Sequence, residues 1–279
     1  MYNWSHYFDP LLGPVDYSCV YDIKFNGNAR EYIRRLIKSE HWPIQVKPDS
    51  IVTTKDSEIN RARDILNTFF GRSLRGKKVL DYGCGNAILA KVGLEMGINV
   101  VSFDTKEEKE PDVIDDVRKM LSLGPYDHIL LYDVIDHLDP TALELQTTLS
   151  VLKGAMSAHT LMHVRAHPFC SRHAMHTYHK LNKAYAHFFL TPDELKEYGF
   201  TEDPLFKCLD PYVQYQSLFA SVGMKAVAVK YITHPVEPFF MPLLPFAKHH
   251  YVDSVPDDIS ILKSMSVSFV DMVCILEEK

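Results

Sequence analysis

Short apolar runs that alternate with helical patterns constrain the fold more than any other feature of this chain. Because strands that are apolar on both faces are typical of a parallel sheet covered by helices, the alternation predicts an α/β fold with a doubly wound, mainly parallel sheet. The runs of strand character are residues 78–81, 99–103, 128–134 and 160–164, and the helical patterns between them are residues 87–95 and 141–152.

The remainder of the chain predicts additions to this core. Residues 1–55 are predicted to form an N-terminal extension or lid with a helix at 29–39, and residues 56–279 the main domain, beginning with a helix at 56–70. Residues 167–211 and 234–262 are predicted to be substrate-side insertions, because long connections in compact domains usually carry function. The part of the second insertion that is rich in proline and aromatic residues is expected to be a loop that covers part of the sheet. Further elements are expected at residues 212–220 (helix), 225–232 and 269–276 (strands).

Bulk properties indicate a soluble, cytosolic protein with no membrane partner. The formal net charge is −6 and the sequence pI about 6.1, so there is no overall positive field for binding nucleic acid without sequence preference. The chain has no apolar run of the roughly 18 residues that a membrane span needs, and its first residues do not resemble a secretory signal. The five cysteines contain no C-x-x-C pair, which suits a reducing compartment; they are Cys19, Cys84, Cys170, Cys208 and Cys274.

A glycine-containing turn follows the first predicted strand, in the sequence Asp81-Tyr82-Gly83-Cys84-Gly85. Open α/β sheets bind nucleotides at this kind of strand-to-helix turn, and the two glycines let the backbone approach a ligand closely. Asp104 ends the second predicted strand, where an acid can hold a ribose diol. The sequence therefore predicts a crevice for a nucleoside-containing ligand.

The charge of Asp81 decides which nucleoside cofactor is favoured. A carboxylate before the glycines would repel a pyrophosphate, but it favours the ammonium and sulfonium groups of S-adenosylmethionine. The third glycine expected for a dinucleotide site is replaced by Ile88. A nicotinamide-dependent oxidoreductase and a non-catalytic binding module with the same fold are the alternatives.

The motif DYGCG resembles the first motif, [DE]-x-G-x-G, of the class I S-adenosylmethionine-dependent methyltransferases, and the resemblance extends over about residues 57–165. It implies a seven-stranded sheet with the last strand antiparallel and S-adenosylmethionine as the cofactor. It also implies that the turn surrounds the methionine part of the cofactor, while Asp104 binds the ribose and Asp116 lies near the adenine. The predicted cofactor-binding residues are Asp81, Tyr82, Gly83, Cys84, Gly85, Asp104, Asp116 and Asp133.

The fourth predicted strand, YDHILLYDVIDHL, resembles the fourth motif of the same family. The resemblance places Asp133, Asp136 and His137 at its carboxyl end, beside the transferred methyl group. An oxygen or nitrogen acceptor must lose a proton, and a histidine with a pKa near neutrality can accept it. Asp136, His137 and His167 are accordingly predicted as the catalytic residues on the acceptor side.

Histidines are abundant around and after the fifth predicted strand, and three interpretations stay open. His163, Arg165 and His167 alternate on one strand face, while His173, His176 and His179 recur at helical spacing. Most could be ordinary hydrogen-bonded histidines, or one or two could bind the acceptor together with Arg165 or Arg172. The full set is His159, His163, His167, His173, His176, His179 and His187.

The third interpretation, which is the least favoured, is a divalent metal held by Asp133, Asp136 and His137 together with His167 or His173. The acid-x-x-acid-His run resembles in outline the metal-dependent small-RNA terminal 2′-O-methyltransferases. Those enzymes have glutamates where this chain has aspartates, and no residue is assigned as a metal ligand.

The predicted reaction is in-line methyl transfer to an oxygen or nitrogen acceptor. The amino-methyltransferase signature [ND]-P-P-[YFW] is missing from the end of the fourth strand, so exocyclic base amines are disfavoured as acceptors. The acid-His run and the clustered arginines and histidines slightly favour RNA, at an end or a ribose 2′-oxygen. A small molecule is the alternative acceptor.

Overall fold

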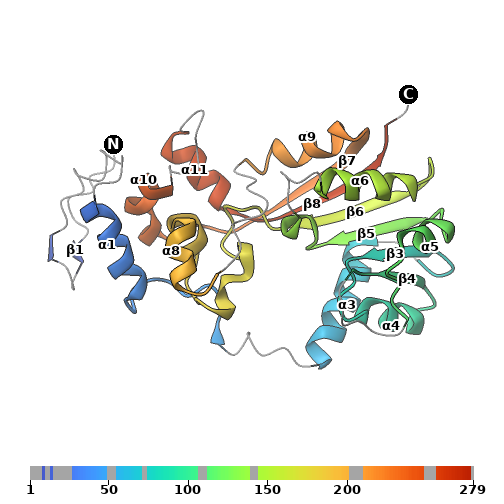
Figure 1. Cartoon of the computed structure of the whole chain (residues 1–279), viewed down its shortest axis with the longest axis horizontal. Coiled ribbons are helices and arrows are strands. Elements are labelled where there is room, and N and C mark those ends of the chain that lie inside the picture. The colour runs from blue at the N-terminus through green and yellow to red at the C-terminus, as the bar shows by residue number, and fades with distance from the viewer. Residues whose placement is uncertain are drawn as a thin grey trace.

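The computed structural model describes residues 8–9, 13–14, 27–48, 55–70, 74–105, 112–138, 144–200, 210–247 and 256–277 (Figure 1). Its strands are β1 (Phe8–Asp9), β2 (Gly13–Pro14), β3 (Lys78–Tyr82), β4 (Asn99–Phe103), β5 (His128–Tyr132), β6 (Leu161–Ala166), β7 (Met224–Thr233) and β8 (Val267–Leu276). Its α-helices are α1 (Gly27–Lys38), α3 (Lys55–Phe70), α4 (Ile88–Glu95), α5 (Val117–Ser122), α6 (Glu144–Gly154), α7 (Ala186–Phe189), α8 (Pro192–Glu197), α9 (Gln214–Ser221), α10 (Leu244–Ala247) and α11 (Asp258–Met265). Three 3₁₀ helices are η3 (Ile135–His137), η4 (Ala174–His179) and η5 (Pro238–Leu243). Within these described ranges, no helix combines the length and the apolar character that crossing a membrane requires.

The main sheet has the order β4-β3-β5-β6-β8-β7. Strands β3 to β6 are parallel, and β8 runs antiparallel to both of its neighbours, so the expected mainly parallel sheet with an antiparallel last strand is confirmed. In the described residues it has six strands where seven were expected. The edge beside β4 carries only a parallel bridge between Phe103 and Ile114. Asp116 already caps α5 two residues later, which leaves no length for a strand.

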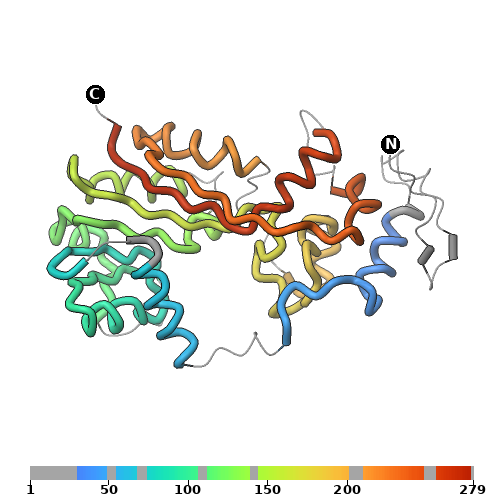
Figure 2. Tube along the Cα trace, turned by 180° about the vertical axis from the view of Figure 1, so that it is seen from behind, coloured from blue at the N-terminus to red at the C-terminus, as the bar shows by residue number. Residues whose placement is uncertain are grey.

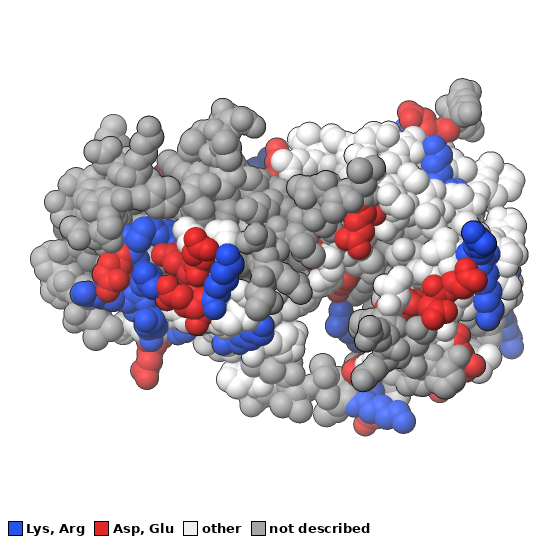
Figure 3. Space-filling model, in the orientation of Figure 1, with Lys and Arg blue, Asp and Glu red and all other residues white. Residues whose placement is uncertain are grey.

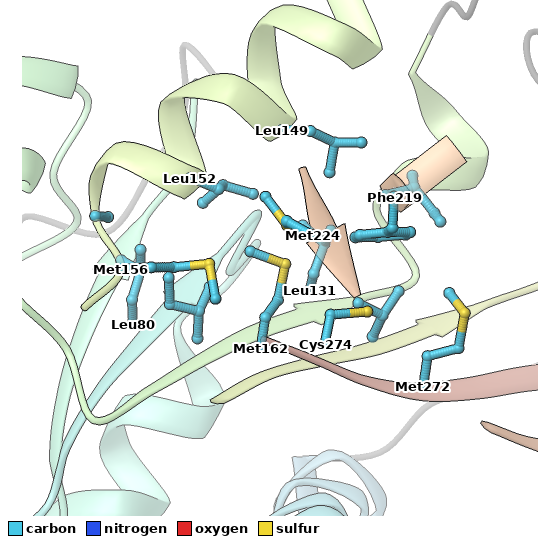
Figure 4. Close-up of a cluster of buried hydrophobic side chains, with 14 of the residues drawn as sticks. Leu80, Leu131, Leu149, Leu152, Met156, Met162, Phe219, Met224, Met272 and Cys274 are labelled. Carbon is cyan, nitrogen blue, oxygen red and sulfur yellow. The ribbon is translucent and has the colours of Figure 1, made fainter. Parts of the chain in front are cut away.

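The two faces of the sheet are covered by different helices, as alternation along each strand requires. Leu80 and Leu131 point to one face, where they pack in the same buried cluster as Leu149 of α6 and Phe219 of α9 (Figure 4). The neighbouring residues of the same strands contribute to the opposite face, in a cluster with α3 and α4 that contains Val79, Leu130, Ala62, Leu66, Leu89 and Val92. The part of the sheet formed by β3 and β5 is therefore buried on both sides, which explains the continuous apolar runs of these strands, whereas the edge strand β7 is mostly exposed or half-buried.

A second lobe lies at one end of the sheet, and β7 and β8 run from the sheet toward it (Figures 1 and 2). It brings together α1, η4, α7, α8, η5, α10 and α11 around a core of its own. Trp42 is 1 % exposed at its centre, packs edge-on against Phe189 and Phe240, and donates its indole N–H to the carbonyl of Ala184 at 2.8 Å. Parts of the N-terminal extension and of both insertions thus pack together, while their role as a lid or substrate-side elements stays a prediction.

The segment from His234 was expected to be a loop over the sheet, and this expectation was wrong in two respects. It contains η5 and α10, and its Phe240, Leu243 and Phe246 are buried in the core of the second lobe. Pro238 lies at the start of η5, where a proline is compatible with helical geometry because no N–H partner is needed there.

A largely buried ion pair joins α1 to α8 within the second lobe and provides a stability prediction. Arg30 pairs with Glu194, whose carboxylate also completes a capping box with Thr191, and the two charged side chains are 13 % and 11 % exposed. Arg30→Ala is expected to lower the free energy of unfolding by about 3 kcal/mol, because it leaves a buried carboxylate without its cation. Arg34→Ala removes a more exposed ion pair with Glu197, so we expect the free energy of unfolding to fall by only about 0–1 kcal/mol. Urea unfolding of both variants measures these changes. Equal losses of unfolding free energy in the two variants would contradict the prediction.

Candidate functional site

A pocket opens at the carboxyl ends of β3, β4 and β5, where open parallel sheets bind ligands. Its volume is about 450 Å³, within the usual range for small-molecule and cofactor sites. Its lining consists of Tyr82, Gly83, Phe103, Asp104, Thr105, Asp133, Val134, His137, Leu138, Glu144 and Thr148. The lining therefore includes several predicted site residues from two separate motifs.

The glycine turn after β3 depends on the absence of side chains. Gly83 has φ +74° and Gly85 has φ +55°, in the left-handed region that favours glycine. A Cβ atom on Gly83 would lie 2.7 Å from Cγ2 of Val134. The N–H groups of Gly83 and Cys84 donate to the carbonyl of Phe103 at 2.8 and 3.1 Å, so the turn is held between β4 and the segment after β5.

Two acids lie directly beneath this turn. Asp104 is 6 % exposed, lines the pocket, and its Oδ2 accepts a hydrogen bond from the N–H of Gly85 at 2.7 Å. Asp81 is equally buried and lies behind the pocket wall; burial, together with the charge of Asp104, raises its pKa to about 7. A cation bound in the pocket would offset the repulsion between these carboxylates.

The pocket wall carries three carboxylates, from Asp104, Asp133 and Glu144. Among the described residues that line it there is no lysine or arginine. Glu144 and Thr148 were not predicted as site residues, although four-residue spacing on a helix places them on one face. The sequence did not show that this face of α6 is turned toward the glycine turn.

Asp81 makes the binding of a cationic ligand depend on pH. Asp81 holds its proton up to about pH 7, and above that value its ionised form favours a bound cation. The same raised pKa makes the empty fold less stable as the pH rises from about 4 to about 7. We expect the affinity for S-adenosylmethionine to fall about tenfold between pH 8 and pH 6. The nearby charge that acts on Asp81 is that of Asp104, while burial and the charge of Asp81 raise the pKa of the Cys84 thiol, which stays neutral in this pH range.

Calorimetric titration across this pH range measures the effect, with Asp81→Asn as the control. The variant should bind more weakly at pH 8 and show a flatter profile. An equally steep profile in Asp81→Asn would contradict the assignment to this residue.

Asp133 begins the acceptor side of the pocket. Its φ of +52° turns the chain out of the sheet, so β5 ends at Tyr132 rather than at residue 134 as predicted. Its Oδ2 accepts from Nη2 of Arg61 at 2.9 Å, and its Oδ1 lies 3.7 Å from Nε2 of His167. Burial and the nearby charge of Asp136 raise the pKa of Asp133 to about 7.

His167 lies beside Asp133 in a defined tautomer. Its Nδ1 is 3.2 Å from the carbonyl oxygen of Ser268, which can only accept, so Nδ1 carries the proton and the lone pair of Nε2 is directed to Asp133. Burial and the neighbouring histidines lower the pKa of His167 to about 3. Such an imidazole is a poor base near neutral pH, and the predicted catalytic role of His167 stays a prediction.

The predicted row of His173, His176 and His179 does not form. Met175 and His176 have φ values of +58° and +46°, which break η4 instead of continuing a regular helix. The kink brings the ring of His176 over that of His137, with centroids 5.3 Å apart and planes 12° from parallel. His137 also lines the pocket, and Asp136 lies beside it with a side chain that is 9 % exposed.

Asp116 is one of six predicted site residues that do not line the pocket; the others are Asp81, Cys84, Gly85, Asp136 and His167. Asp116 is exposed, and its side chain accepts from the N–H groups of Arg118 and Lys119 as the N-cap of α5. Capping accounts for this acid without a ligand. Its predicted contact with the adenine stays a prediction.

Comparison with known proteins places the chain in a family. The profile of the methyltransferase domain family matches residues 56–200, and no curated protein matches the chain. It is similar to a S-adenosylmethionine-dependent methyltransferase from Archaeoglobus fulgidus, with 18 % identity, 80 % of this chain and 94 % of that chain covered, and a TM-score of 0.43. It is also similar to the PH0226 protein from Pyrococcus horikoshii OT3, with 16 % identity, coverage of 89 % and 99 %, and a TM-score of 0.48. The family match confirms the resemblance seen in the sequence, and the chain belongs to the methyltransferase domain family.

Proposed function

We propose that this chain binds S-adenosylmethionine in the pocket beside the glycine turn and transfers its methyl group to an oxygen or nitrogen acceptor. The observation that supports this most is the charge of the pocket, which has three carboxylates and, among its described lining residues, no lysine or arginine. One of these carboxylates, that of Asp133, is already paired with Arg61. Such a lining attracts the sulfonium and ammonium groups of this cofactor and repels the phosphates of a dinucleotide.

The cofactor supplies an activated methyl group, and the protein has to place the acceptor in line with the carbon–sulfur bond at about 3–3.5 Å. The acceptor atom then forms a bond to the methyl carbon, the carbon–sulfur bond breaks, and the acceptor loses its proton. Asp104 and Gly83 follow β4 and β3, whereas Asp133 and His137 follow β5, and all four line the pocket. We assign the first group to cofactor binding and the second to the acceptor side.

RNA, at an end or a ribose 2′-oxygen, is our preferred acceptor, with a small molecule as the alternative. The position of the acid-His run in the pocket wall supports an acceptor with a polar oxygen. On the face seen in Figure 3, described basic and acidic side chains are interspersed, and the molecule is hollowed between its two lobes. A hollow of this kind suits a small molecule or the end of a chain better than the side of a long duplex.

Incubation with methyl-labelled S-adenosylmethionine and a fractionated cell extract tests the proposal. We expect label in the RNA fraction, and its removal by ribonuclease would identify RNA as the acceptor. Label confined to the metabolite fraction would favour the small-molecule alternative. Cofactor binding without transfer to any fraction would contradict the catalytic function and favour a binding module.

A further inference from the structure

We propose that Asp136, His137 and His176 bind a divalent transition-metal ion at the acceptor side of the pocket. One potential ligand atom from each of these residues lies within 4.8 Å of the other two. Asp136 and His137 belong to η3, whereas His176 comes from η4 of the insertion after β6. His137 also lines the pocket, so an ion held here would face the space assigned to the acceptor.

Within the part of the chain that the structure describes, two buried carboxylate oxygens at this place have no hydrogen-bond partner, namely Oδ1 of Asp136 and Oδ1 of Asp133. The side chains of these residues are 9 % and 11 % exposed. Buried polar atoms are almost always partnered, and an unpartnered carboxylate oxygen is especially unfavourable. A bound cation would provide the missing partner for Asp136, directly beside two imidazole rings.

The geometry is close to that of a metal site and needs a small contraction. Ligand atoms bound at 2.0–2.2 Å to one ion lie roughly 3–4 Å apart. The potential ligand atoms of Asp136, His137 and His176 lie within 4.8 Å of one another, so they have to move slightly closer together. Two side chains can make this adjustment by rotation, because His137 is 52 % exposed and His176 lies on a kink rather than in a regular helix. The two rings are stacked, so the exposed ring of His137 has to turn out of the stack before both imidazole lone pairs can point at one ion.

The ligand set indicates the kind of ion. One carboxylate and two imidazoles suit manganese, iron, cobalt or zinc, while magnesium and calcium prefer oxygen ligands alone. Three protein ligands leave coordination positions open for another molecule. This set differs from the one considered from the sequence, in which His167 or His173 was the additional ligand.

The role of the ion rests on the proposed function and makes it more specific. An acceptor hydroxyl oxygen bound at an open position would become more acidic, as water does on a catalytic metal. Its proton leaves to solvent, its oxygen forms the bond to the methyl carbon, and the carbon–sulfur bond breaks with release of S-adenosylhomocysteine. The inferred acceptor is therefore an oxygen nucleophile rather than an amine.

Titration of the metal-free full-length chain with Co²⁺, followed by visible absorption, tests the site. We expect one Co²⁺ per chain, with d–d bands of nitrogen and oxygen ligation and much weaker binding of Mg²⁺. Asp136→Asn and His176→Gln should each weaken Co²⁺ binding by at least about tenfold. His173→Gln is the matched control, since His173 lies in the same segment but outside the cluster, and its affinity should stay within about twofold of the original.

Unchanged Co²⁺ affinity in His176→Gln, or no stoichiometric binding by the original chain, would overturn the inference. Thermal unfolding of each variant shows whether a loss of binding reflects a loss of fold. Titration with S-adenosylmethionine, performed on the same metal-free samples, separates the two proposals. Cofactor binding without Co²⁺ binding would remove the metal site alone, whereas no cofactor binding would remove the proposed function.

Discussion

Replacing Asp104 by asparagine is expected to weaken S-adenosylmethionine binding by about 10- to 100-fold. The residue is buried at the pocket wall, where a carboxylate can accept hydrogen bonds from the ribose and attract the positive charges of the cofactor. A charge-assisted hydrogen bond contributes about 1.5–3 kcal/mol, which corresponds to this range of affinities. Isothermal titration calorimetry at pH 8 measures the change directly.

Asp116→Asn is the matched control for this experiment. It makes the same chemical change at an acid that is exposed and caps α5 outside the pocket lining. Its affinity for the cofactor should stay within about twofold of the original, since asparagine is also a good N-cap. Equal losses in the two variants would contradict the assignment of the pocket as the cofactor site.

Gly83→Ala is expected to lower the free energy of unfolding by about 2–5 kcal/mol. Left-handed backbone costs a non-glycine residue about 1–2 kcal/mol, and overpacking against a neighbour adds about 1–3 kcal/mol. Both effects apply here, because φ is +74° and the new Cβ would lie 2.7 Å from Cγ2 of Val134. Denaturant unfolding followed by circular dichroism checks the value.

Gly76→Ala separates the two contributions. Gly76 has a similar φ of +77°, but a Cβ added there meets nothing within 4 Å. We expect a loss of about 1–2 kcal/mol from backbone strain alone. If both variants lose the same free energy, the contact between Gly83 and Val134 does not constrain the turn.

The core strands could be predicted from the sequence because burial on both faces leaves a strong local signal. The prediction for β3 missed only Tyr82, and the prediction for β4 has the observed bounds. The turn between β3 and α4 was equally readable, since its glycines occupy positive φ values that few other residues adopt. The local sequence was therefore sufficient to predict β3, β4 and the glycine turn.

The acceptor side could not be predicted in the same way, because its residues meet only through tertiary packing. Asp133 and His176 adopt left-handed backbone conformations, although neither is a glycine. Nothing in the local sequence indicates these turns, and periodicity instead suggested a longer strand and a helical row. The position of Glu144 likewise depends on how α6 is rotated against the sheet, which requires knowing its buried neighbours.

The central claim is that the carboxylates of the pocket select a cationic sulfur cofactor over one that carries phosphates. Titrating the same preparation with S-adenosylmethionine and with NAD⁺ tests it most directly. We predict saturable one-to-one binding of S-adenosylmethionine and no detectable heat with NAD⁺. Binding of NAD⁺ at this site, with none of S-adenosylmethionine, would contradict the account.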